Sequence, residues 1–278
     1  MEAVLEFALA DLAQPALLEE AYEFVHTVFA GGLAIGITGE PVQELETPSD
    51  RRTRERFDSP AAAAKYASRS NWDRRHREAS CILSALAGIP RGARILDLPC
   101  GTGFLAPILA ERGYRVTSAD SSPHMIERAE RNWLKACEAN PSLAGSARFE
   151  VQDIFDTSFR DGEFDAVICN RLFHHFTEPH TRRAALAELR RISRGPVIVF
   201  FFHSFALDSI RLRFLRSCFG KWKRDRMPIS KGEFAADGRA AGLDLDRLVA
   251  TRWGISPQCF AVFHPPTTPG PMAVGTPS

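Results

Sequence analysis

Three carboxylates and a glycine-rich turn stand out because of their types and spacing. Asp97 ends a short apolar run, and residues 101–106 then supply a Gly-x-Gly turn that leads into an apolar segment of helical period. Asp120 and Asp153 each end a further apolar run. Glycines let a ligand approach the backbone closely, and the N–H groups of a helix start favour polar or anionic ligand atoms. A carboxylate asks instead for a cationic or hydroxyl-rich ligand, so a nucleotide-like cofactor with an ammonium group meets both demands.

Strands and helices must position these groups, and apolar runs alternate with helical patterns along the chain. We predict strands over residues 94–97, 115–120, 147–154, 164–170, 195–202, 243–253 and 258–264. We predict helices over residues 105–112, 123–139, 181–194 and 231–241, the last capped by Gly242. The first five strands are mostly apolar, as is typical of parallel strands buried on both faces. The sequence predicts an α/β fold with a doubly wound, mostly parallel seven-stranded sheet and a terminal antiparallel hairpin.

All three acids fall at the carboxyl ends of successive predicted strands, where ligands bind in open α/β sheets. Each has a plainer interpretation too: Asp97 could cap the following turn, Asp120 the next helix and Asp153 a loop. Residues 101–106 also fit the dinucleotide fingerprint G-x-G-x-x-G/A. Two details argue against a dinucleotide. Residues 97–100 separate the strand from the glycines, whereas the fingerprint normally follows its strand directly, and the Asp97 carboxylate would repel a pyrophosphate.

The sequence D-x-P-C-G-T-G at residues 97–103 resembles motif I of the class I S-adenosylmethionine-dependent methyltransferases. Residues 120–129, D-S-S-P-x-M-I-E-x-A, resemble the second motif of that family. The resemblance covers residues 57–264 and implies S-adenosyl-L-methionine as cofactor, with its methionine moiety on the glycine turn. It also implies that Asp153 bonds the adenine amino group and that the Ile154 N–H meets a ring nitrogen. The predicted cofactor-binding residues are Asp97, Gly101, Gly103, Asp120, Ser121, Asp153, Ile154 and Asn170.

The family places acceptor-facing groups after the fourth strand, at residues 170–176 here. Nucleic-acid amine methyltransferases have the sequence Asn/Asp-Pro-Pro-aromatic at this place. Here Asn170 is present but the prolines are not, so nucleic acid is not the expected acceptor. The paired Glu loop of protein-arginine enzymes and the Asp/Asn metal site of catechol-type enzymes are absent. The resemblance then implies metal-independent transfer to a small-molecule or lipid-like acceptor by in-line displacement. Histidine can act as a base near neutral pH, so we predict His175 or His174 as general base, with His203 as a further candidate. Packing, or a place beside the cofactor, is the plainer interpretation of each.

Two other functions fit the same pattern. One is an NAD(P)-dependent oxidoreductase on a Rossmann fold, which binding of NADH in preference to S-adenosylhomocysteine would reveal. The other is a catalytically silent methyltransferase-like binding module, with the acidic first segment as its contact surface.

Charge is unevenly distributed over the 278 residues, although the net charge is only +1. Residues 1–50 hold ten Asp or Glu and no Lys or Arg, and we predict an acidic helical extension over residues 1–56. Residues 57–264 form the predicted methyltransferase domain. Within it, residues 205–231 form a basic, amphipathic, lid-like helical insert that would suit an apolar acceptor or peripheral contact with a membrane. Residues 265–278 are predicted to be a disordered tail.

The six cysteines are scattered, without the spacing of a zinc site. They indicate small buried residues in a reducing compartment, and we predict no metal. No secretion signal is visible, and the apolar run at residues 25–37 is too short to span a bilayer. We therefore predict a cytoplasmic protein.

Overall fold

The computed structural model describes residues 72–204, 228–252 and 256–266. The predictions for the acidic extension, for most of the basic insert and for nearly all of the tail lie outside the described residues. Among the described helices, none is both long and apolar enough to cross a membrane.

The described chain forms a sheet of seven strands in the order β3-β2-β1-β4-β5-β7-β6. The strands are β1 (Arg94–Asp97), β2 (Arg115–Asp120), β3 (Ala147–Val151), β4 (Ala166–Cys169), β5 (Val197–Phe202), β6 (Asp244–Ala250) and β7 (Gln258–His264). The α-helices are α5 (Trp72–Ala85), α6 (Leu105–Glu111), α7 (Pro123–Ala139), α8 (Pro179–Ile192) and α10 (Lys231–Ala240). Two 3₁₀ helices are η1 (Pro141–Leu143) and η2 (Phe173–His175).

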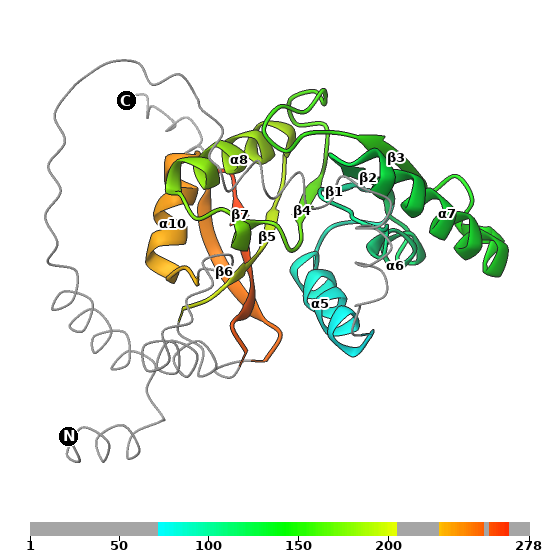
Figure 1. Ribbon diagram of the computed structural model, residues 1–278, viewed down its shortest axis with the longest axis horizontal. Coiled ribbons are helices and arrows are strands. Elements are labelled where there is room, and N and C mark those ends of the chain that lie inside the picture. Colours follow the sequence, from blue (N-terminus) through cyan, green and yellow to red (C-terminus); the bar gives the residue numbers. More distant parts are fainter. Residues whose placement is uncertain (1–71, 205–227, 253–255, 267–278) are drawn as a thin grey trace, which may run out of the picture. The chain divides into compact units, whose positions relative to one another are not determined.

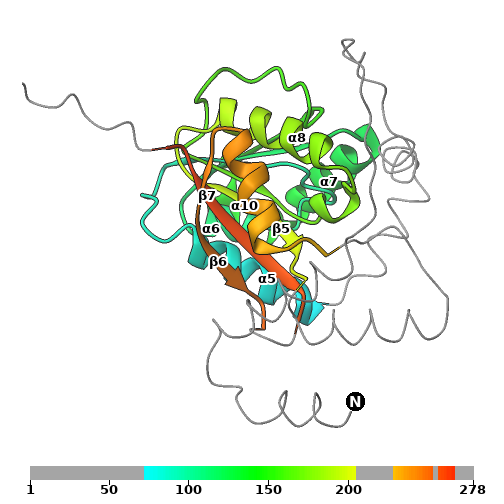
Figure 2. The same ribbon diagram turned by 90° about the vertical axis from the view of Figure 1, so that its left-hand side faces the viewer.

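The predicted fold class is confirmed. Strands β1 to β5 pair in parallel, whereas β7 runs antiparallel to both β5 and β6. Strand β7 therefore lies between β5 and β6, and β6 forms one edge of the sheet. This edge faces the viewer in Figure 2. Some predicted bounds are wrong: β3 ends at Val151 and not at residue 154, and α8 begins at Pro179, two residues early. Proline at a first helical position needs no backbone N–H, which explains the early start.

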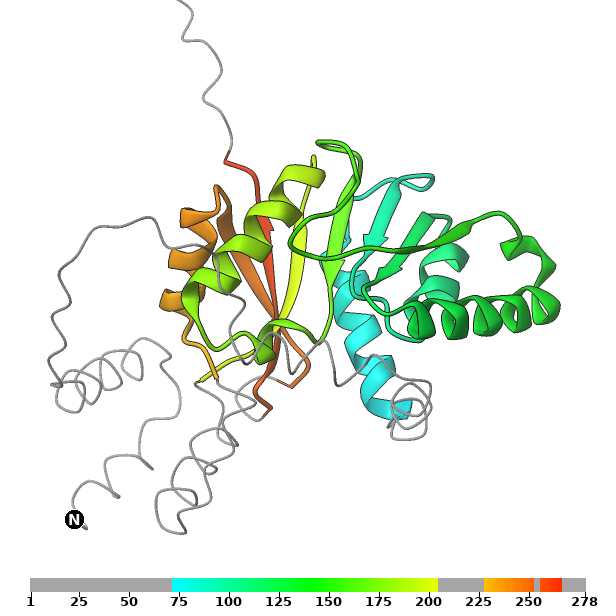
Figure 3. The same cartoon turned by 45° about the horizontal axis from the view of Figure 1, so that its top comes forward.

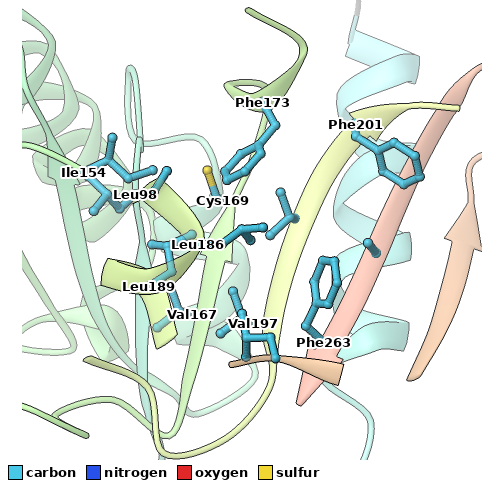
Figure 4. Packing of buried hydrophobic residues seen from close by; sticks show 14 of the residues in the cluster. Leu98, Ile154, Val167, Cys169, Phe173, Leu186, Leu189, Val197, Phe201 and Phe263 are labelled. Atoms are coloured by element: carbon cyan, nitrogen blue, oxygen red, sulfur yellow. The ribbon is translucent and has the colours of Figure 1, made fainter. Parts of the chain in front are cut away.

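Helices cover both faces of the sheet (Figures 1 and 3). Successive residues of a strand point to opposite faces, so Ile95 belongs to the core cluster that contains residues of α5 and α6, whereas Leu96 belongs to the cluster that contains residues of α8 and α10. In Figure 4, Leu186 and Leu189 of α8 lie beside Val167 and Val197 of the central strands. This two-sided burial explains why β4 and β5 are continuous apolar runs, whereas the edge strand β3 is only partly buried and carries charged residues.

Local signals fix several helix ends. The Met125 N–H donates to the Ser122 Oγ at 3.4 Å, which caps α7 as its Ser-Ser-Pro start predicts. A capping box between Ser230 and Glu233 begins α10. Gly242 follows the end of α10 with a φ of +75°, a left-handed conformation that favours glycine.

Candidate cofactor and acceptor site

The predicted cofactor residues gather at one edge of the sheet. Asp97 and Asp120 are the last residues of the paired parallel strands β1 and β2. Asn170 directly follows β4, which pairs with the other side of β1, and Asp153 lies two residues beyond β3. Because parallel strands end at the same edge, four separate sequence motifs meet there.

The turn after β1 is tied closely to its neighbours. The Leu98 N–H donates to the Ile168 carbonyl at 2.9 Å, and the Cys100 N–H donates to the Ala119 carbonyl at 2.7 Å. The turn is therefore hydrogen-bonded to β2 and β4, the strands on either side of β1. From α7, the Asn132 Nδ2 donates to the Thr102 carbonyl at 2.9 Å, a contact that the sequence analysis did not foresee.

The two predicted glycines of this turn have different constraints. Gly101 and Gly103 have φ values of +54° and +74°, which favour glycine. A Cβ built on Gly103 would lie 2.9 Å from the Ala129 Cβ and 3.1 Å from the Ala129 Cα. Gly103 therefore lets α7 pack against the turn, a helix-packing reason that is separate from any contact with a ligand.

Asp120 organises the turn through both carboxylate oxygens. Its Oδ2 accepts from the Gly101 N–H at 2.9 Å, and its Oδ1 accepts from the Ser122 N–H at 3.0 Å. Burial raises the pKa of Asp120, while these two backbone hydrogen bonds lower it. Each carboxylate oxygen can accept more than one hydrogen bond, so a ligand hydroxyl can still be bound. Ser121, between these groups, is exposed.

Asp97 is the most unusual carboxylate of the described chain. It is 1% exposed, and its Oδ1 has no hydrogen-bond partner among the described residues. Burial, and then the neighbouring charge of Asp120, raise the pKa of Asp97 well above its ordinary value. A buried carboxylate without a partner is costly, so this position favours a cationic hydrogen-bond donor.

Asn170 presents a second such acceptor. Its Oδ1 is also buried and has no partner within the described part of the chain. Asp97 and Asn170 lie at the ends of adjacent strands, since Asp97 is paired with Ile168 in the register of β1 and β4. Two unpartnered oxygens at neighbouring strand ends suit a group with several N–H donors, such as an ammonium.

Asp153 and Ile154 begin the loop after β3. The Asp153 Oδ1 accepts from the Phe155 N–H at 3.0 Å, the loop-capping role that is its plainer interpretation. The other carboxylate oxygen is not used in that bond. The Ile154 side chain is 6% exposed and packs in the core with Leu98.

The segment after β4 brings the two candidate bases side by side. The ring centroids of His174 and His175 are 4.0 Å apart. His174 is 7% exposed, and its ring packs against Phe202 and Phe200 at 4.9 and 5.9 Å, whereas His175 is only half-buried. The two histidines therefore occupy different environments, because His174 lies inside an aromatic cluster and His175 is partly exposed.

His203 lies just beyond β5, and its backbone bonds to the segment that leads into the neighbouring strand β7. Its N–H donates to the Pro257 carbonyl at 2.7 Å, and its ring lies 5.9 Å from that of Phe201. Phe201 belongs to the core on the α8 and α10 face, while His174 packs with the opposite face through Phe200. The structure thus separates His203 from the pair formed by His174 and His175.

Ion pairs hold the acceptor segment at both of its ends. Arg171 donates to both carboxylate oxygens of Glu78, at 2.8 and 2.9 Å. Arg182 is 5% exposed, pairs with Asp237 at 2.7 Å and donates to the carbonyls of Phe176 and Thr177 at 3.3 and 3.1 Å. Sequence reasoning missed both pairs, because partners 93 and 55 residues apart leave no periodic signal.

Comparison with known proteins agrees with this geometry. Residues 95–195 match the model of a methyltransferase domain. A glycine/sarcosine N-methyltransferase of Parasynechococcus marenigrum is 40% identical over 114 residues, which are 40% of this chain and 38% of the relative. A ubiquinone biosynthesis O-methyltransferase of Xanthomonas axonopodis pv. citri is 28% identical over 56% of this chain and 65% of the relative. The chain thus matches less than two thirds of the length of either relative.

Solved structures show the same fold. The magnesium protoporphyrin IX methyltransferase of Synechocystis PCC 6803, solved with bound S-adenosylhomocysteine, has a TM-score of 0.58 and 19% identity. The match covers 78% of this chain and 99% of that structure. A didemethyltoxoflavin N-methyltransferase of Burkholderia thailandensis has a TM-score of 0.56 and 17% identity, over 82% of this chain and 93% of that one.

The sheet order, with acids at the carboxyl ends of neighbouring strands, is that of an α/β domain of the kind that binds its ligand at those ends. The matched domain indicates the class: residues 95–195 are a methyltransferase domain, in agreement with the resemblance of the motifs to class I S-adenosylmethionine-dependent methyltransferases. The cofactor of this class is S-adenosyl-L-methionine, as the sequence predicts, and the dinucleotide alternative gains no support.

The residues present fit that cofactor. The unpartnered oxygens of Asp97 and Asn170 offer acceptors for its ammonium group. The turn at Gly101 leaves backbone open to close approach, and Asp120 keeps acceptor capacity for ribose hydroxyls. The assignment of these residues to the cofactor stays a prediction, with a physical reason for each.

Proposed function

We propose that this protein transfers the methyl group of S-adenosylmethionine to a small-molecule or lipid-like acceptor, without a metal ion. The observation that carries the proposal is the pair of buried oxygens on Asp97 and Asn170, which have no partner among the described residues and lie at the ends of the adjacent strands β1 and β4. Such a pair has a physical need for a cationic donor, which a pyrophosphate-containing dinucleotide does not supply.

The proposed cofactor contacts follow from the placement of each group. Asp97 and Asn170 hold the ammonium group, Asp120 accepts from the ribose hydroxyls, and the turn at Gly101 and Gly103 receives the methionine moiety. Asp153, through the carboxylate oxygen that does not cap its loop, accepts from the adenine amino group. The Ile154 backbone N–H and the exposed Ser121 complete the nucleoside side of the site.

The bound cofactor supplies a sulfonium methyl group that is already activated, so the protein's main task is to position the acceptor. An acceptor nitrogen with a free lone pair needs no base, while a hydroxyl or enol must lose a proton. Relatives named as a glycine/sarcosine N-methyltransferase and a ubiquinone biosynthesis O-methyltransferase support a small-molecule acceptor, as does a structural neighbour with bound 1,6-didemethyltoxoflavin. Cytoplasmic location and peripheral membrane contact stay predictions from the sequence.

For an acceptor that must be deprotonated, we propose His175 as the base. His174 is enclosed by Phe200 and Phe202, where a charged imidazolium would be poorly solvated. His175 is half-buried, so it can exchange protons with solvent, and it lies in the segment that follows β4, at the edge of the sheet where we propose that the cofactor binds. His174 then serves to support the ring of His175 at a centroid distance of 4.0 Å.

Isothermal titration calorimetry with S-adenosylhomocysteine and NADH tests the proposal. We expect the wild-type protein to bind S-adenosylhomocysteine and not NADH. Asp120→Ala should lower the affinity about tenfold or more, because a buried ligand hydroxyl would lose its partner. Asp161→Ala, at a carboxylate whose side chain is 83% exposed, is the matched control and should bind normally.

A screen of small acceptors with methyl-labelled cofactor then identifies the substrate class. Binding of NADH without S-adenosylhomocysteine would overturn the methyltransferase proposal in favour of an oxidoreductase. Tight S-adenosylhomocysteine binding without transfer to any amine, hydroxyl or enol acceptor would point to a catalytically silent binding module.

A further inference from the structure

Helix α5 contacts both halves of the site, although it belongs to neither set of sequence motifs. On one side, Arg75 lies over the ring of Phe104 at 5.0 Å, and His76 meets the same ring edge-on at 5.6 Å. Phe104 directly follows Gly103 of the cofactor turn. On the other side, Glu78 binds Arg171, which directly follows Asn170. One helical turn of α5 thus spans from the cofactor turn to the acceptor segment.

The pair of Glu78 and Arg171 has the features of a rigid connection. The Glu78 side chain is 2% exposed and that of Arg171 is 20% exposed. The guanidinium donates through two nitrogens to two carboxylate oxygens, a bidentate geometry that restricts rotation of both side chains. Removal of one partner would leave the other charge buried and uncompensated.

Arg171 also has an unusual backbone. Its φ is +61°, and it is the only non-glycine residue with a positive φ among those the structure describes. A left-handed conformation is unfavourable for arginine, so it persists only where surrounding contacts enforce it. The paired guanidinium is such a contact, and the reversal at this residue sets the direction in which the chain leaves Asn170 and enters η2.

We propose that Glu78 and Arg171 are positioning residues that hold Asn170 against the amino-acid end of the cofactor. This inference rests on the proposed function. The ion pair fixes the left-handed turn, and the turn fixes the amide oxygen of Asn170 beside Asp97. The same turn sets the start of the segment that carries His175. Neither Glu78 nor Arg171 touches the reacting atoms.

Two cofactor fragments separate this role from general stability. S-Adenosylhomocysteine contains the ammonium group, whereas 5′-methylthioadenosine keeps the adenine, ribose and sulfur and lacks the amino-acid portion. Glu78→Gln and Arg171→Lys should each weaken S-adenosylhomocysteine about tenfold or more, as expected when a hydrogen bond to a charged group is lost. Their affinity for 5′-methylthioadenosine should stay within about twofold, because its binding groups lie away from the pair. Calorimetry measures both.

Glu188→Gln is the matched control. Glu188 forms a similar bidentate pair with Arg191, at 2.6 and 2.7 Å, near the end of α8. Its loss should lower the Tm without changing the ratio of the two affinities. A decrease in affinity for both ligands by the same factor in Glu78→Gln, or no decrease for either, would overturn the positioning role.

Arg171→Gly and Arg171→Ala separate the backbone turn from the ion pair. Both lose the guanidinium, but glycine adopts the positive φ without strain. We expect the wild-type protein to bind S-adenosylhomocysteine most tightly, Arg171→Gly less tightly and Arg171→Ala most weakly. Equal affinity in all three proteins would contradict the proposal. If the wild-type protein binds neither ligand, the proposed function itself fails, and that result is distinct from every outcome for the variants.

Discussion

The two halves of the site are built in different ways. In the cofactor half, at the ends of β1, β2 and β3, groups are held by hydrogen bonds that involve nearby backbone, as when the Asp120 carboxylate accepts from the N–H groups of Gly101 and Ser122. In the acceptor half, after β4, support comes from distant side chains. Arg171 reaches back to Glu78, and the chain after His175 is held by Arg182.

This difference matches what each half must do. A cofactor common to a whole class can be bound by a short turn and strand-end acids, which a local sequence motif can encode. An acceptor segment must take different shapes in different members, so its position depends on contacts particular to each chain. A substitution in the cofactor half should therefore act on cofactor binding. In the acceptor half, a substitution at Arg171 should also act on cofactor binding, because Arg171 positions Asn170, whereas a substitution at His175 should act mainly on turnover.

The largest effect is expected at the glycine turn. Gly103→Val should abolish measurable S-adenosylhomocysteine binding, because its Cβ would lie within 2.9 Å of the Ala129 Cβ and its φ is +74°. Gly101→Val should do the same through its φ of +54° and its place on the turn. Calorimetry checks both, with circular dichroism to confirm folding.

Gly88→Ala is the control for backbone strain alone. Gly88 has a φ of +94°, and a Cβ there would meet nothing within 4 Å. This variant should lose about 1–2 kcal/mol of stability but bind S-adenosylhomocysteine normally. Normal binding by both Gly101→Val and Gly103→Val would show that this turn does not bind the cofactor. The division of the site into a cofactor half and an acceptor half would then be wrong.

The next effect tests the acceptor half. If the acceptor is a hydroxyl or enol, His175→Gln should lower kcat about 10²–10⁴-fold, because a general base contributes that much. S-Adenosylhomocysteine affinity should change little. Wild-type activity should rise with pH through the range in which histidine titrates, and the variant should lose that dependence. Steady-state kinetics across pH measure both properties.

His174→Gln sharpens the assignment. We expect it to lower the Tm, since it disturbs the cluster with Phe200 and Phe202, and to lower kcat less than His175→Gln does. A larger kcat loss in His174→Gln would exchange the two roles. A flat pH profile with near-normal kcat in both variants would remove the pair from the chemistry and leave positioning alone, or His203.

The smallest effect concerns Asp97 and the stability of the cofactor-free protein. Burial raises the folded-state pKa of Asp97 above the unfolded value, so ionisation opposes folding. The stability contribution is fully present below the unfolded pKa of about 4 and is lost as pH rises through the folded pKa. Asp97→Asn should remove that loss and raise the Tm at pH 7, by about 2–4 °C for each kcal/mol recovered.

The same variant should bind S-adenosylhomocysteine more weakly, because the ammonium group loses its charged partner. Scanning calorimetry at pH 5 and pH 8 checks the stability change, and titration calorimetry checks the binding. A Tm that falls in Asp97→Asn at pH 8 would mean that the carboxylate is already compensated in the free protein, and that it is not held ready for a cation.

The amino-acid sequence by itself determined the fold class, the class of cofactor and the residues proposed to bind it. It could do so because apolar runs, strand-end acids and glycine turns are local patterns: Asp97, Asp120 and Asp153 are each recognisable from neighbouring residues. Strand ends were less certain, as at β3, because a strand stops where its hydrogen-bonded neighbour stops, and that neighbour lies elsewhere in the chain.

Only the tertiary structure decided how those elements constrain one another. It placed β7 between β5 and β6, brought Ala129 against Gly103, and enclosed His174 while it left His175 half-buried. It also joined Glu78 to Arg171 across 93 residues. Each of these outcomes depends on which surfaces meet when helices pack on a sheet, and packing between distant segments has no signature in the local order of residues.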